Sequence, residues 1–72
     1  MIEKEIAIKI KALALNAVES LHDAVTIAHN ECSQEDFDKI RRGVGLSIGR
    51  IQMDLLEEIY TQYPELDHLT ES

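Results

Sequence analysis

The chain has 72 residues, with one proline, one cysteine and a formal net charge of -7. A single cysteine excludes an internal disulfide, and a core of this size rarely leaves more than about 3–5 kcal/mol of net stability unless a metal, a disulfide or a partner adds to it. The acidic balance argues against nucleic-acid binding, which depends on clustered Lys and Arg that neutralise phosphates.

The apolar beginning of the chain is interrupted by Lys4, Lys9 and Lys11. It therefore lacks the continuous apolar run of a secretory signal, and no segment approaches the ~20 apolar residues that cross a bilayer. We expect a cytoplasmic protein with no membrane contact. The lone cysteine agrees with a reducing compartment.

The first predicted helix covers about residues 2 to 30. Its apolar residues recur at steps of three and four, and several are alanines, which let a neighbouring helix approach closely. We expect this face to pack against a second helix. Its members are Ile6, Ile10, Leu13, Ala17, Leu21, Ala24 and Ala28.

The second predicted helix covers about residues 34 to 62. Ser33 is a good N-cap, and Glu35 and Asp36 favour the positive end of the helix dipole. Pro64 cannot continue the hydrogen-bond ladder, so residues 64 to 72 form a short tail. The short connection between two long helices predicts one all-α domain, an antiparallel helical hairpin over residues 1 to 72.

The second helix carries apolar residues on two opposite faces. One stripe is expected to meet the first helix and consists of Phe37, Ile40, Val44, Ile48, Ile51, Leu55 and Ile59. The opposite stripe has no partner within one hairpin, which predicts dimerisation into a four-helix bundle. The predicted dimer interface consists of Gly45, Leu46, Gly49, Met53, Leu56 and Tyr60.

The segment between Gly43 and Gly49 is the weak point of the second helix, since each helical glycine costs roughly 0.8–1 kcal/mol relative to alanine. Either the helix continues through it, or the chain kinks and a third helix starts near Leu46. The apolar stripe keeps its phase across the glycines, which favours a continuous helix.

No constellation of residues indicates catalysis, a metal or a cofactor. His22 and His29 are seven residues apart, or about 10 Å along a helix, too far to share an ion that holds its ligands at ~2 Å. His29 and Cys32 would make only half a site, which a partner subunit or His68 would have to complete. The acidic neighbours of Cys32 oppose a reactive thiolate, and no histidine is placed to act as its base.

The sequence therefore favours a non-enzymatic, homodimeric regulatory or adaptor module that acts through protein–protein contacts. A special case is an acidic inhibitor or immunity-type protein that masks a basic partner, because residues 51 to 72 contain six acids and no Lys or Arg. The alternative is a small helical enzyme or anion-binding dimer with a pocket near Arg41, Arg42 and Arg50.

Overall fold

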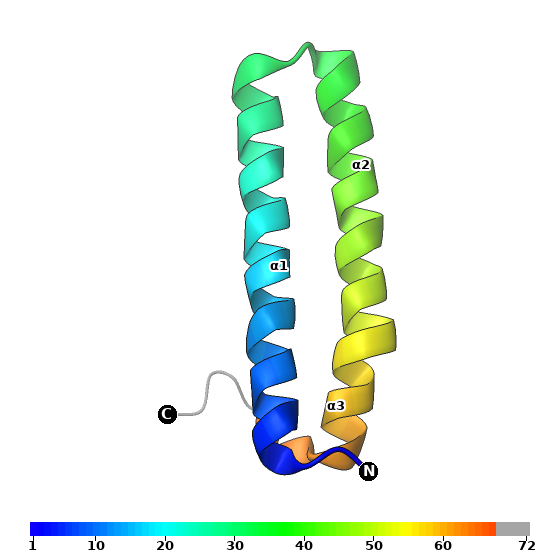
Figure 1. Cartoon of the computed structure of the whole chain (residues 1–72). Coiled ribbons are helices and arrows are strands. Elements are labelled where there is room, and N and C mark those ends of the chain that lie inside the picture. Colours follow the sequence, from blue (N-terminus) through cyan, green and yellow to red (C-terminus); the bar gives the residue numbers. More distant parts are fainter. Residues whose placement is uncertain (68–72) are drawn as a thin grey trace.

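The computed structural model describes residues 1–67, and within that range the protein is an all-α helical hairpin (Figure 1). The prediction of this fold class is confirmed. The elements are α1 (Lys4–Glu31), α2 (Gln34–Arg50), the π-helical segment η1 (Ile51–Leu56), α3 (Glu57–Gln62) and the 3-10 turn η2 (Pro64–Asp67). Residues 68–72 of the predicted tail lie outside the described part.

The first arm of the hairpin is α1, and the second arm consists of α2, η1 and α3. The two arms run antiparallel and give a rod of 45 × 23 × 18 Å. They are joined by Cys32 and Ser33 alone, so the second arm has to fold back directly along the first. The predicted N-cap is confirmed, because the Ser33 hydroxyl accepts a hydrogen bond of 3.2 Å from the Asp36 N–H. Beside this turn the ring of Phe37 meets the His29 ring edge-on, with the centroids 5.2 Å apart.

The second arm is helical from residue 34 to residue 62 without a gap, as predicted. It passes through all three glycines as regular α-helix, and no residue of the described range has a positive φ. The departure from α geometry comes one turn later, in η1. There the Glu57 N–H bonds the carbonyl of Gln52, five residues back instead of four, so the helix accommodates one extra residue.

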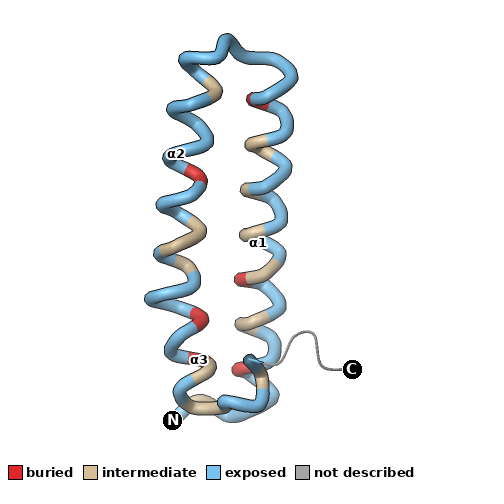
Figure 2. Tube along the Cα trace, turned by 180° about the vertical axis from the view of Figure 1, so that it is seen from behind, coloured by how far each residue is buried: buried red, intermediate tan, exposed pale blue. Residues whose placement is uncertain are grey.

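The core lies along the line where the arms face each other (Figure 2). On α1 this line follows a heptad pattern whose buried or half-buried members are Ala7, Lys11, Ala14, Val18, Leu21, Val25 and Ala28. The predicted packing face was therefore wrong in part: Ile6, Leu13 and Ala17 are exposed. The members of this line that are fully buried are the three alanines, whose small side chains let the two backbones come close together, while Val18, Leu21 and Val25 are half-buried.

The extra residue in η1 changes which leucine of the second arm faces α1. The inward face passes from Ile51 to Leu56, a step of five residues, and then to Ile59. Leu56 is consequently 2% exposed, whereas Leu55 is 41% exposed. The prediction that Leu55 belongs to the packed stripe was wrong, since it assumed α-helical spacing throughout.

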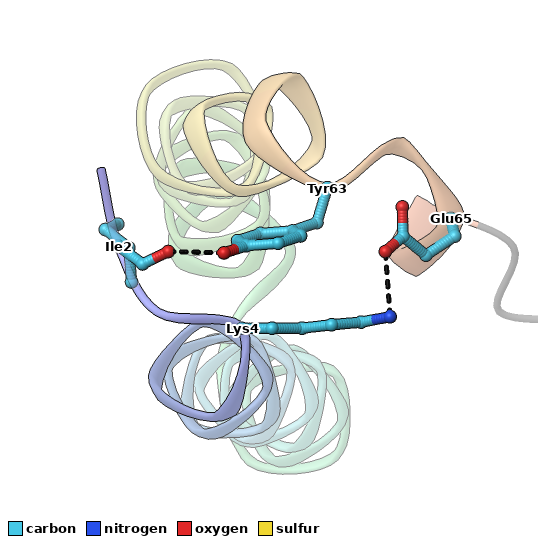
Figure 3. A network of polar contacts seen from close by, with 4 residues as sticks. All are labelled: Ile2, Lys4, Tyr63 and Glu65. Atoms are coloured by element: carbon cyan, nitrogen blue, oxygen red, sulfur yellow. Dashed lines mark hydrogen bonds and ion pairs between the residues drawn. The ribbon is translucent and has the colours of Figure 1, made fainter.

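Polar contacts hold the two chain ends of the described range together (Figure 3). The Tyr63 hydroxyl donates to the Ile2 carbonyl at 2.6 Å, and the Ile2 N–H donates to the Gln62 side-chain carbonyl at 2.8 Å. Lys4 Nζ lies 2.8 Å from a Glu65 carboxylate oxygen. This hydrogen bond to Lys4 is the main cause that lowers the pKa of Glu65 below its ordinary value.

The inward turn of Leu56 predicts unequal costs for two adjacent leucines. We expect Leu56→Ala to lower the free energy of unfolding by about 2–4 kcal/mol, because it leaves a cavity in the core. Leu55→Ala serves as the matched control and is expected to cost about 1 kcal/mol or less, since that side chain is partly in water. Urea unfolding followed by circular dichroism measures both values. A larger cost at Leu55 would mean that the helix keeps α-helical spacing through this segment.

The Lys4–Glu65 contact predicts a pH effect with a defined sign. Because the native pKa of Glu65 is lower than its pKa in the unfolded chain, the contact stabilises the fold above the unfolded pKa and is lost as the pH falls through the native pKa. We expect Lys4→Gln to raise the Glu65 pKa, as measured by carboxyl-carbon NMR titration. Lys9→Gln is the control and should leave this pKa where it is. An unchanged pKa in Lys4→Gln would exclude the contact.

Candidate interaction surfaces

The surface of the hairpin is rich in large apolar side chains. Among residues 1–67, Val44, Leu56 and Ile59 are the only large apolar residues that are buried, alongside three alanines. Nine large ones are exposed: Met1, Ile6, Ile8, Leu13, Ile27, Ile40, Leu46, Met53 and Leu55. Single exposed apolar residues are ordinary, but contiguous ones mark interaction sites. The question is therefore how these nine are arranged.

One group lies on the outer side of the second arm, and we call it the glycine surface: Gly45, Leu46, Gly49 and Met53. These residues share a helix face because Gly45, Gly49 and Met53 follow one another at steps of four and Leu46 precedes Gly49 by three. Leu46 is 67% exposed and Met53 is 73% exposed. A Cβ atom added at Gly45 or Gly49 would meet no other atom within 4 Å, so the face between the two large side chains is open.

The remaining members of the predicted dimer interface are taken up by their own hairpin. Leu56 is buried against α1, because the extra residue of η1 turns it inward, and it is not available to a second chain. Tyr60 is half-buried, with the Lys11 ammonium 5.9 Å from its ring centre. Burial is the main cause that raises the Tyr60 pKa above its ordinary value, and the nearby Asp67 carboxylate raises it further. Of the four large side chains of the predicted interface, Leu56 is thus covered by its own hairpin, Tyr60 is half-covered, and Leu46 and Met53 are exposed.

A second group of mostly apolar residues lies on α1. The packing face predicted from the sequence combined part of this group with residues of the core line. We call the group the outer stripe; its members follow steps of four and three and are Ile6, Ile10, Leu13, Ala17, Ser20, Ala24 and Ile27. Leu13 is the most exposed of these large side chains, and Ile10 and Ala24 are half-covered. The signal was present in the sequence as a second 4–3 repeat, one residue behind the core line.

The three arginines of the alternative anion site lie on the second arm, where carboxylates of the same helix are close to two of them. Arg50 lies 2.7 Å from Asp54, one turn along the helix. Arg41 lies over the Phe37 ring and 4.0 Å from Asp38. Two of the three cations are therefore already paired along their own helix.

A shallow hollow of about 280 Å³ lies toward the open end of the rod, and none of the three arginines belongs to its lining. Its lining combines apolar side chains with two acids: Leu15, Gln52, Leu56, Glu57, Tyr60 and Asp67. The acids would repel an anion rather than bind it. The hollow therefore gives no support to an anion-binding dimer.

The described part of the chain offers little for catalysis or metal binding. No three His, Cys, Asp or Glu side chains of residues 1–67 gather as metal ligands. Cys32 is a free, exposed thiol at the turn between the arms. His68, which could have completed a site with His29 and Cys32, lies outside the described residues.

Comparison of the chain with protein-family models, with curated proteins and with solved structures finds no match. None of the helices in residues 1–67 has the length and apolar character needed to cross a bilayer.

Proposed function

We propose that the protein is a homodimeric helical module that acts through protein–protein contacts and has no enzymatic activity of its own. The observation that carries this proposal is the balance between covered and uncovered apolar side chains. Of the large apolar residues of the described range, the hairpin exposes nine, fully buries three and half-covers the others. In a monomer of this kind many large apolar side chains would stay in water, where they contribute little to stability.

The energetic argument favours a second chain. Full burial of a Leu, Ile or Met side chain contributes about 1.5–3 kcal/mol, while the core alanines bring much less. A standard interface covers about 800 Å² on each partner, which is about 15% of the 5482 Å² of accessible surface in one chain. Two hairpins joined in this way form a four-helix bundle, the arrangement that antiparallel hairpins commonly adopt.

The two apolar surfaces on different arms suit an adaptor. A dimer contact that covers one of them leaves the other free on each subunit. The free surface can then take an apolar helix face of another protein, a common mode of recognition between proteins. We place this activity in the cytoplasm, where an exposed single cysteine such as Cys32 stays reduced.

A basic partner is the second candidate, and the acidic lining of the hollow favours it. Glu57 and Asp67 both line this hollow, and no Lys or Arg belongs to the lining. A Lys or Arg side chain of a partner would find opposite charge there and an apolar floor for its aliphatic part. In that case the module would mask a basic surface.

The proposed dimer predicts a concentration-dependent mass. Sedimentation equilibrium at ~10–100 μM should give twice the chain mass of 8.2 kDa, and dilution should reduce the helical circular-dichroism signal because subunit burial contributes to folding. The measurement requires the full chain without tags. A hairpin that stays fully helical and monomeric over this range would refute the proposed function.

A further inference from the structure

Taking the proposed homodimer as its basis, we propose that the second copy binds along the outer stripe of α1. The two α1 helices then lie antiparallel, related by a two-fold axis that passes near Ala17. The other surface of the hairpin, the glycine surface, stays free. Three independent features of the stripe lead to this assignment: its length, the order of its side-chain sizes and the charges along its edge.

The stripe is long and free of charge. From Ile6 to Ile27 it covers 21 residue steps, or about 32 Å at 1.5 Å per residue, and none of its seven positions is charged. It therefore runs along most of the 45 Å rod. The glycine surface has only Leu46 and Met53 as large exposed side chains, since Leu56 is buried in the hairpin and Tyr60 is half-buried.

The order of sizes along the stripe is self-complementary. A two-fold rotation about an axis near Ala17 places each residue of one subunit opposite a residue of the other subunit. The two residues lie at similar distances from the axis, on opposite sides of it in the sequence. Ile10 then faces Ala24 and Leu13 faces Ser20, so large side chains meet small ones. At each end of the contact Ile6 of one subunit faces Ile27 of the other. Ala17 lies at the axis, where the backbones approach most closely.

The charges along the edge of the stripe obey the same symmetry. Lys9, Asn16 and Asp23 follow one another at heptad spacing, beside the stripe and exposed to solvent. The two-fold rotation places Lys9 of one subunit opposite Asp23 of the other, twice, with Asn16 near the axis. Neither Lys9 nor Asp23 takes part in an ion pair within the described residues 1–67. In a parallel two-fold pair this edge would lie on opposite sides of the contact in the two subunits, so Lys9 would not meet Asp23.

Two leucines of equal exposure supply the first test. Leu13 is 68% exposed on the outer stripe, and Leu46 is 67% exposed on the glycine surface. Leu13→Glu should convert the wild-type dimer to monomer in sedimentation equilibrium, because it places two carboxylates in the apolar contact. Leu46→Glu is the control and should leave the dimer intact.

Charge reversal supplies a second test that does not depend on the stability of the Leu13 variant. Lys9→Asp and Asp23→Lys each replace two attractive pairs by two repulsive ones, and each should raise the dimer dissociation constant about tenfold. The double variant Lys9→Asp/Asp23→Lys restores opposite charges and should return to within about threefold of wild type. Glu19→Lys, an exposed reversal on the same helix away from the stripe, controls for net charge.

The outcomes separate this inference from the proposed function. If the wild type is a dimer that Leu46→Glu dissociates and Leu13→Glu does not, the second copy binds the glycine surface, so the inference fails and the proposed dimer stands. Failure of the double variant to recover, with both single variants weakened, would overturn the antiparallel arrangement. A monomeric wild type whose outer stripe instead holds a different protein would overturn both.

Discussion

The close approach of the two arms along the alanine line of α1 is the interaction on which the remaining structure depends. Ala7, Ala14 and Ala28 recur at multiples of seven residues and are almost fully covered by the second arm. Small side chains at these positions allow near contact of the backbones, but they bury little area, so the core is thin. Three large aliphatic residues of α1, Ile6, Leu13 and Ile27, are left exposed on the outer stripe. The thin core inside the hairpin and the apolar stripe left outside it thus have the same cause, the distribution of small and large side chains around α1.

The π-helical segment determines which side chains of the second arm pack against the alanine line of α1. A single extra residue between Ile51 and Leu56 advances the inward face, so that Leu56 and Ile59 are buried and Leu55 is not. Such segments are uncommon in helices, and a regular α-helix here would have turned a different leucine inward. The same insertion removes Leu56 from the outer side of the arm. The local backbone geometry therefore limits the apolar area that the glycine surface can offer to another molecule.

The open end of the rod combines polar contacts with the burial of Ala7 and Ile59. Ile2 is tied to Gln62 and Tyr63 through its backbone, and Lys4 to Glu65 through an exposed ion pair. One exposed pair of this kind contributes little, but together with the hydrogen bond that the Lys11 ammonium donates to the Leu66 carbonyl it ties η2 to α1. The turn at the opposite end is held by the Ser33 cap and by the contact between His29 and Phe37. Both ends are thus closed, which leaves the long apolar sides of the rod as the surfaces open to other proteins.

The sequence by itself determined the number of long helices, the cap at Ser33, the helix through Gly43, Gly45 and Gly49, and the end before Pro64, because each rests on local backbone chemistry or on a periodic pattern within one segment. It also identified Leu46 and Met53 as outward-facing. Only the tertiary structure decided which of two parallel stripes on α1 faces inward, and that Leu56 rather than Leu55 joins the core. Both stripes of α1 have the same 4–3 repeat, so periodicity alone cannot rank them. The choice depends on how closely the two arms approach and on the extra residue in η1, and neither is a property of one helix taken alone.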